Sequence, residues 1–160
     1  MFVMGIDPGL SATGYGLVEG GYPPIARLAG VIRTDPGATM AVRLHELFLG
    51  LTQVIEESRP DAVAVETVFT NRNLQTAIAV GRASGVALLV AARAGVNVSE
   101  YAPTAVKSAV TGDGAANKTQ IQSMVARLLR LTDPPKPADA ADALAIALCH
   151  LRAAPLERAR

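Results

Sequence analysis

The apolar residues of this 160-residue chain follow two alternating patterns. Short apolar runs bounded by turn residues predict β-strands, whereas apolar residues that recur every three or four positions predict helices. The predicted strands are Phe2–Ile6, Thr13–Val18, Ile25–Thr34, Asp61–Val68 and Val96–Tyr101. The predicted helices are Met40–Ser58, Asn73–Ala94, Pro103–Val110, Lys118–Leu131 and Pro137–Leu151.

The order of these elements predicts an α/β fold. Three strands precede the first helix, and helices and strands then alternate until the chain closes with helices. A meander followed by helix–strand crossovers indicates a five-stranded mixed sheet flanked by helices on both faces. Because such crossovers are right-handed, we expect the fourth strand beside the first. The chain shows no repeats, so we expect one domain over residues 1–152 and a flexible C-terminal tail over 153–160.

Composition adds limits to this picture. Half of the residues are hydrophobic and 18% are charged, which is typical of a globular protein with a substantial core. A single cysteine excludes an internal disulfide and favours the cytoplasm, and we expect neither a signal peptide nor a membrane span. Residues 66–130 hold seven Lys and Arg against three Asp and Glu, a basic zone compatible with a phosphate-rich partner.

Two carboxylates stand out in the last predicted helix. Asp139 and Asp142 are three residues apart, which places them on one helix face, and the rest of Pro137–Leu151 offers them no basic partner. Unpaired acids against an apolar core are costly to ionise, and a bound cation is the usual remedy. Alternatively, Asp139 lies in the first turn only to favour the helix dipole and cap the N-terminus.

Two further acids stand at strand ends. Asp7 follows the first strand and Glu66 lies near the end of the fourth, so adjacent strands bring both to the edge where sites form in such sheets. Four carboxylates in one crevice need cations, and all-oxygen ligands suit Mg²⁺ or Mn²⁺ rather than zinc. A pair of such ions serves in-line displacement at a phosphodiester. The alternative is that Asp7 and Glu66 only bond backbone amides.

Three segments of the chain resemble one known family. GIDPG…TGYG at Gly5–Gly16, VAVETVF at Val63–Phe69 and ADAADALAIA at Ala138–Ala147 are similar to the RuvC family of Holliday-junction resolvases, with the same spacing from Met1 to about Leu151. The resemblance implies a ribonuclease-H-like fold, a homodimer and Mg²⁺ dependence. It also implies a structure-selective endonuclease of homologous recombination and DNA repair. Such an enzyme cuts two opposed strands of a four-way DNA junction and leaves 5′-phosphate and 3′-hydroxyl ends. A RuvA–RuvB branch-migration complex is the implied partner.

The resemblance also assigns roles to single positions. It implies that the catalytic and metal-binding residues are Asp7, Glu66, Asp139 and Asp142. Lys107 and Lys118 fall where the family has basic residues near the DNA, and Phe69 matches an aromatic residue that stacks on bases, although it could instead pack in the core. Arg72 and Asn73 open a helix and could meet phosphates.

The chain departs from the family pattern at three positions near the expected DNA contacts. Ser84 replaces a common arginine, and Arg82 lies too far around the helix to substitute for it. Asp113 puts a negative charge in a loop expected to be neutral or basic, and Asn117 stands where an acid is common. These departures leave DNA affinity and sequence preference open.

Two other functions start from the same residues. A ribonuclease-H-like domain could act on RNA or an RNA/DNA hybrid, or only bind a partner, because the acids alone do not select DNA. Asp7 with Thr13-Gly14 also resembles the phosphate loop of actin-like ATPases, but 160 residues leave no room for a second lobe. For the dimer, we expect the Ala- and Gly-rich helix Asn73–Ala94 to contribute to the interface.

Overall fold

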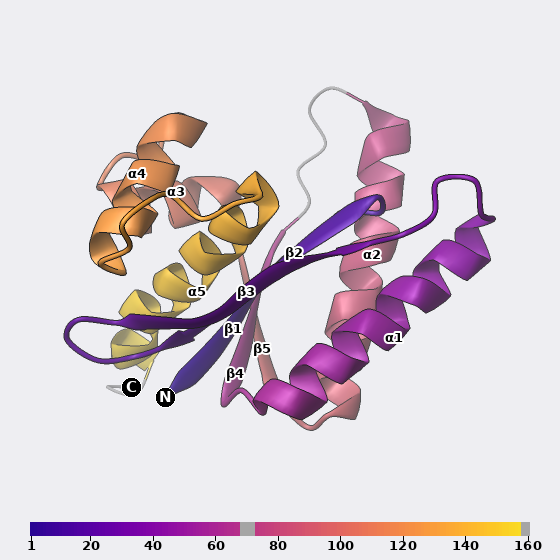
Figure 1. Cartoon of the computed structure of the whole chain (residues 1–160), viewed down its shortest axis with the longest axis horizontal. Coiled ribbons are helices and arrows are strands. Elements are labelled where there is room, and N and C mark those ends of the chain that lie inside the picture. The colour runs from indigo at the N-terminus through magenta and orange to yellow at the C-terminus, as the bar shows by residue number, and fades with distance from the viewer. Residues whose placement is uncertain (68–72, 158–160) are drawn as a thin grey trace.

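The structure, a computed structural model, describes residues 1–67 and 73–157 of the chain (Figure 1). The strands are β1 (Phe2–Asp7), β2 (Ala12–Glu19), β3 (Ile25–Arg33), β4 (Ala62–Glu66) and β5 (Asn97–Tyr101). The helices are α1 (Met40–Ser58), α2 (Leu74–Arg93), α3 (Pro103–Thr111), α4 (Lys118–Leu128) and α5 (Ala138–Glu157). Each predicted element is present. Two candidate DNA-binding residues, Phe69 and Arg72, lie outside the described residues.

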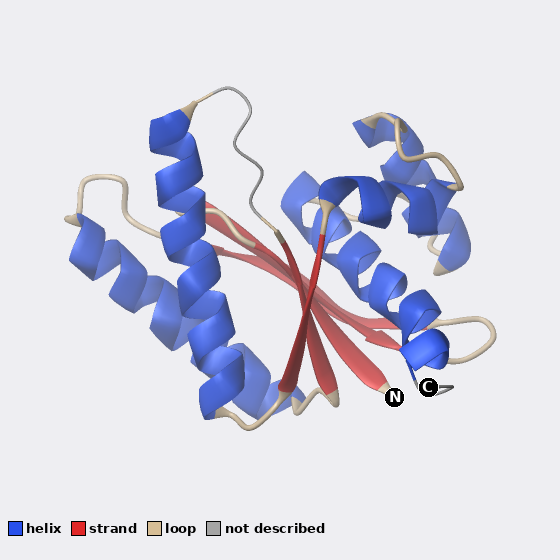
Figure 2. Cartoon of the chain, turned by 180° about the vertical axis from the view of Figure 1, so that it is seen from behind, coloured by secondary structure: helices blue, strands red, loops and turns tan. Residues whose placement is uncertain are grey.

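The strands form one mixed sheet in the order β3-β2-β1-β4-β5. The meander β1-β2-β3 is antiparallel, and β4 pairs with β1 and β5 in parallel, so the expected place of the fourth strand is confirmed. α1 and α2 cover one face of the sheet, and α3, α4 and α5 cover the other (Figure 2). The predicted mixed sheet between two helical layers is therefore the observed architecture.

The central strands serve both layers because successive side chains point to opposite faces. In β1, Met4 and Ile6 are fully buried against the α1–α2 layer, whereas Val3 is buried in the core formed with α5. In β4, Val63 and Val65 face α1 and α2, and Ala64 faces α5. The same alternation sends the residues that end these two strands toward α5.

Two helices, α4 and α5, end several residues away from their predicted ends. α4 stops at Leu128 rather than Leu131 because Arg130 adopts a left-handed conformation, with φ of 52°, and the amide of Leu131 donates to the carbonyl of Ala126 at 2.8 Å. α5 continues to Glu157, past the expected end at Leu151. Arg152 contributes to that extension, because its guanidinium donates to the carbonyl of Ala109 in α3.

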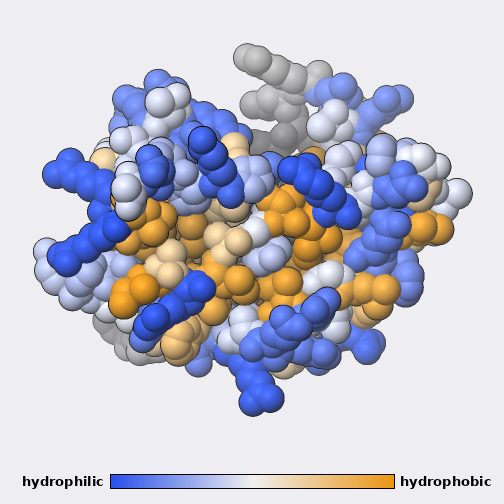
Figure 3. Space-filling model, in the orientation of Figure 1, coloured by the Kyte–Doolittle hydropathy of each residue, from blue (hydrophilic) through white to orange (hydrophobic). Residues whose placement is uncertain are grey.

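β3 is an edge strand with a mixed surface. In the space-filling view, apolar residues gather across the middle of the face that β3 crosses, with charged residues around them (Figure 3). Ile25 and Leu28 of β3 are 43% and 40% exposed, and the exposed Arg27 and Arg33 lie on the same strand. Charged side chains on an exposed edge disfavour pairing with another strand.

α5 lies unusually close to β1 and β2 because glycines stand beneath it. Gly5 and Gly16 are partners in register, and Gly14 is the partner of Asp7. A Cβ atom at Gly5 would overlap the carbonyl oxygen of Ala143 in α5, and one at Gly16 would lie 2.8 Å from the Leu144 side chain. We call Gly5, Gly14 and Gly16 the glycine seam. It lets the backbone of the helix rest directly on the backbone of the sheet.

Candidate active site

Asp7 and Glu66 end two adjacent parallel strands on the side of the sheet that α5 covers. Strand alternation fixes their direction, since each follows a residue that faces α1 and α2. Asp142 enters from α5 and completes a set of three carboxylates. Asp7, Glu66 and Asp142 line one cavity of about 250 Å³ together with Lys107 and Lys118. Of the four acids predicted to converge, three therefore line one cavity, and they come from three different elements.

Asp139 lies in the first turn of α5, one turn before Asp142. It does not line the cavity, but its backbone rests on the glycine seam, where a Cβ atom at Gly14 would lie 2.6 Å from the Asp139 carbonyl carbon. Gly14 is also the register partner of Asp7. The close approach of helix and sheet at this glycine is therefore what brings Asp139 beside Asp7.

The acids influence one another electrostatically. Burial, and then the charges of Glu66, Asp142 and Asp139, together raise the pKa of Asp7 from its ordinary value of 3.8 to about 7. Burial, and then the charge of Asp142, also raises the pKa of Glu66. Carboxylates that hinder one another's ionisation in this way require positive charge in their cavity.

One positive charge comes from α4. Lys118 Nζ lies 2.9 Å from Asp142 Oδ2, and this hydrogen bond is the main reason that the pKa of Lys118 is raised. Asn117 places the lysine by capping α4, because its side chain accepts from the amide of Gln120 and the Gln120 side chain accepts from the amide of Asn117. Asp142 therefore has a basic partner that its own helix does not provide.

The donor set fits a hard divalent cation. The cavity offers carboxylate oxygens without His or Cys, which suits Mg²⁺ or Mn²⁺. Over the described residues, no three His, Cys, Asp or Glu side chains stand close enough together to form a ready-made metal site. Lys118 occupies one of these carboxylates, since it forms an ion pair with Asp142. An arriving cation would compete with the ammonium group for the same carboxylate.

The other predicted site residues lie around this cavity in different ways. Lys107 reaches it from α3, which begins two residues after β5 with Pro103 in its first turn. Asn73 caps α2, where its side chain accepts from the amides of Gln75 and Thr76, so that oxygen is engaged within the protein. A DNA contact by Asn73 stays a prediction.

Two of the departures from the family pattern have structural explanations. Ser84 is 6% exposed and lies on the buried side of α2, so this position faces the sheet in the structure. Asp113 Oδ1 accepts from the amide of Ala115 at 2.8 Å and so braces the loop between α3 and α4. Its charge is exposed beside that loop.

The loop after β1 is braced by side chains for which the sequence analysis predicted no such role. The Thr13 hydroxyl donates to the carbonyl of Gly9 at 2.6 Å, and the Thr34 hydroxyl donates to the carbonyl of Leu10 at 2.6 Å. Arg43 Nε donates in turn to the Thr34 hydroxyl oxygen at 2.9 Å. Thr13 and Thr34 are buried, so these bonds fix the loop from inside.

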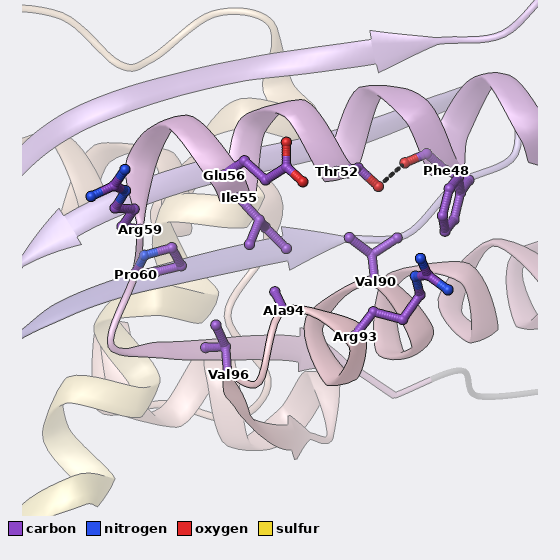
Figure 4. Close-up of a pocket in the computed structure, with 10 residues that line it drawn as sticks. All are labelled: Phe48, Thr52, Ile55, Glu56, Arg59, Pro60, Val90, Arg93, Ala94 and Val96. Carbon is purple, nitrogen blue, oxygen red and sulfur yellow. Dashed lines mark hydrogen bonds between the residues drawn. The ribbon is translucent and has the colours of Figure 1, made fainter.

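A larger hollow lies elsewhere. A groove of about 720 Å³ runs between the C-terminal parts of α1 and α2, with Ile55, Val90 and Val96 among its apolar lining (Figure 4). Its charged side chains are Glu56, Arg59 and Arg93. One carboxylate beside two arginines offers no acid cluster, so the smaller cavity holds the candidate chemistry.

Comparisons with known proteins match almost the whole chain to one family. A family model described as Crossover junction endodeoxyribonuclease RuvC matches residues 3–150. A Crossover junction endodeoxyribonuclease RuvC from Salinispora arenicola is 53% identical over 94% of this chain and 87% of that protein. One from Streptomyces avermitilis is 50% identical over 98% and 90%. The solved structure of Thermus thermophilus RuvC in complex with a Holliday junction substrate is 38% identical, with a TM-score of 0.92 over 98% of this chain and 96% of that one.

Proposed function

This chain belongs to the RuvC family of crossover junction endodeoxyribonucleases, and from this we propose that Asp7, Glu66, Asp139 and Asp142 form its catalytic, metal-binding centre. The fold is ribonuclease-H-like, and the activity is that of a Holliday junction resolvase acting in DNA recombination. The observation that carries the proposed centre is the single cavity lined by Asp7, Glu66 and Asp142, with Asp139 one helical turn away.

Nucleases of this family are metal-dependent. We propose Mg²⁺ as the ion, with Mn²⁺ as a substitute and two ions per site, held by the four acids. The metal held there would supply Lewis-acid assistance to the attacking water and to the departing 3′ oxygen, and the cleavage proposed here leaves 5′-phosphate and 3′-hydroxyl ends. The chain itself contributes Lys107 and Lys118, whose positions in the cavity suit them to hold the DNA backbone against the acids.

The proposed DNA contacts extend beyond the cavity. Phe69 is proposed to stack on a base at the junction, and Arg72 and Asn73 to meet phosphates at the start of α2. The T. thermophilus protein has been solved with a Holliday junction, which supports a four-way junction as the substrate here. RuvA–RuvB as partner complex and the cytoplasm as location complete the proposal.

A substrate panel tests this function. The protein is incubated with Mg²⁺ and a labelled synthetic four-way DNA junction, linear duplex or RNA/DNA hybrid. We expect paired, symmetric nicks on the junction only, and none with Asp142→Asn. Cutting of the hybrid in preference to the junction would replace the substrate while keeping the metal chemistry, and uncut junction in every divalent metal would overturn the nuclease assignment.

We also propose a homodimer, with α2 at its interface. α2 packs on the sheet through one side and exposes an apolar stripe on the other, in which Leu74, Ile78 and Leu89 are 71%, 47% and 53% exposed. Gly81 and Gly85 lie on the same stripe with open space above them, which permits close helix packing. Among the described helices, α2 is the one whose length and composition would allow it to cross a membrane. In the proposed dimer, the second protomer covers this apolar stripe, so that no membrane is needed to cover it.

Charge on this stripe should separate the protomers. Ile78→Glu combined with Leu89→Glu is expected to give a monomer in sedimentation, because two buried carboxylates at a symmetric interface cannot be paired. Leu88 is a poorer position for this test, since it packs against the core. Leu49→Glu in α1 is the matched control, because Leu49 is as exposed as Leu89, at 53%. A double variant that stays dimeric would rule out this stripe as the interface.

A further inference from the structure

Tyr101 lies on β5, directly beside Glu66 on the neighbouring strand β4. It is the last residue of β5 and the register partner of Glu66 in β4. Partners in register point to the same face of a sheet, so the Tyr101 ring and the Glu66 side chain both face α5. The carbonyl of Tyr101 also accepts the amide and the hydroxyl of Thr67, at 2.8 and 3.2 Å. The residue that follows Glu66 is thus tied to Tyr101 by two hydrogen bonds.

The side chain of Tyr101 continues this connection into α5. Its phenol oxygen lies 2.9 Å from His150 Nδ1, and the two rings meet edge to face with centroids 5.9 Å apart. His150 is 4% exposed and Tyr101 is half-buried, so the hydrogen bond is partly shielded from solvent. Such a hydrogen bond is directional, and the buried ring nitrogen would be costly to leave without a partner. It therefore holds helix and strand at one separation.

The separation between α5 and β5 matters because α5 also carries Asp142. His150 follows Asp142 by eight residues, about 12 Å along a rigid helix. Between them, Ala145 lines the acid cavity. Glu66 and Asp142 line this same cavity from the sheet side and the helix side. A shift of α5 at His150 would be transmitted along the helix to this pair of carboxylates.

We infer that Tyr101 is a positioning residue, which acts through its hydrogen bond to His150 to set the distance between Glu66 and Asp142. The inference rests on the catalytic roles proposed above for those two acids. The position of Lys107 also depends on Tyr101, because Lys107 lies on α3, which begins at Pro103, two residues after Tyr101. Tyr101 is thus placed to influence the positions of Glu66, Asp142 and Lys107, although it does not itself line the cavity.

The test is a double-mutant cycle on junction cleavage at saturating enzyme. Tyr101→Phe keeps the ring and removes the hydroxyl, and we expect the cleavage rate to fall on the order of tenfold while the junction Kd is unchanged. His150→Leu should cause the same loss, and the double variant no further loss, because the two residues act as one unit. His150→Asn, which keeps a hydrogen-bonding atom near the place of Nδ1, should restore most of the rate.

Controls separate positioning from stability and from the proposed chemistry. Tyr15→Phe is the matched control, since Tyr15 is partly buried against the other face of the sheet, and its rate should equal that of the wild type. All rates are measured well below each variant's Tm. Full activity of Tyr101→Phe, or rate losses that multiply in the double variant, would overturn the inference. Cleavage retained by Glu66→Gln or Asp142→Asn would overturn the proposed catalytic roles instead.

Discussion

Replacing Asp7 by asparagine should reduce junction cleavage by a factor on the order of 10³ and yet stabilise the metal-free protein above neutral pH. The loss of activity follows from removing one of the carboxylates that line the acid cavity. The gain in stability follows from the pKa of Asp7, which burial and the neighbouring acids raise from 3.8 to about 7. Ionising this carboxyl in the folded protein therefore costs free energy above neutral pH. Asparagine is neutral and does not incur this cost.

The sign of the effect depends on pH. Below about pH 4 the carboxyl is protonated in both the folded and the unfolded chain, so it changes no stability. As the pH rises from about 4 to 7, only the unfolded chain readily releases the proton, and the free energy of unfolding of the wild type falls. The full penalty is present above about pH 7, where we expect Asp7→Asn to be more stable by roughly 2–4 kcal/mol.

Urea denaturation in EDTA at about pH 5 and pH 8 measures this difference, with junction cleavage assayed in parallel. Asp133→Asn is the control, since Asp133 is an exposed acid in the segment that leads to α5. We expect Asp133→Asn to change neither cleavage nor the pH dependence of unfolding. An Asp7→Asn protein that is no more stable than the wild type at pH 8 would contradict the electrostatic account of the cavity, and one that still cuts would remove Asp7 from the catalytic centre.

Gly14→Ala should leave the protein folded but lower cleavage on the order of 100-fold. The new methyl group would meet the backbone of Asp139, whose carbonyl carbon lies 2.6 Å from the position of the added atom. Backbone cannot turn aside as the end of a side chain can, so the first turn of α5 has to move away from the sheet. A displacement of about 1 Å at a catalytic group is enough for a loss of this size.

The control for the glycine substitution is Gly21→Ala in the loop between β2 and β3, where the nearest atom would be 3.6 Å away, an ordinary contact. Overpacking at Gly14 should also lower stability by about 1–3 kcal/mol, which thermal unfolding measures. Junction binding should persist in Gly14→Ala, because the lysines of α3 and α4 are untouched. Wild-type cleavage by this variant would show that α5 can retreat without cost and that the glycine seam does not set the site.

The sequence was sufficient to predict the parts of the site that depend on strand order and side-chain alternation. Apolar runs located β1 and β4, crossover handedness placed them side by side, and Asp7 and Glu66 then had to meet at their carboxyl ends. The helical spacing of Asp139 and Asp142 likewise follows from local geometry alone. These relations hold whatever the distance between helix and sheet.

The contacts that set distances could not be predicted in the same way. Lys118 pairs with Asp142 across two helices, and nothing in the pattern of either helix indicates that their faces meet at those residues. The hydrogen bond between Tyr101 and His150 joins residues 49 positions apart. Gly5, Gly14 and Gly16 stood in a motif that carried the family resemblance, but their physical role, to admit a helix backbone, required the position of α5. Packing between elements decides such features, and local pattern does not record it.

The acid cavity draws its carboxylates from both ends of the chain, with Asp7 on the first strand and Asp142 on the last helix. During synthesis, β1 therefore emerges before α5 and cannot be joined by it until the intervening elements have been made. Until then the growing chain holds no assembled acid cavity, and a chain truncated before α5 would never form one.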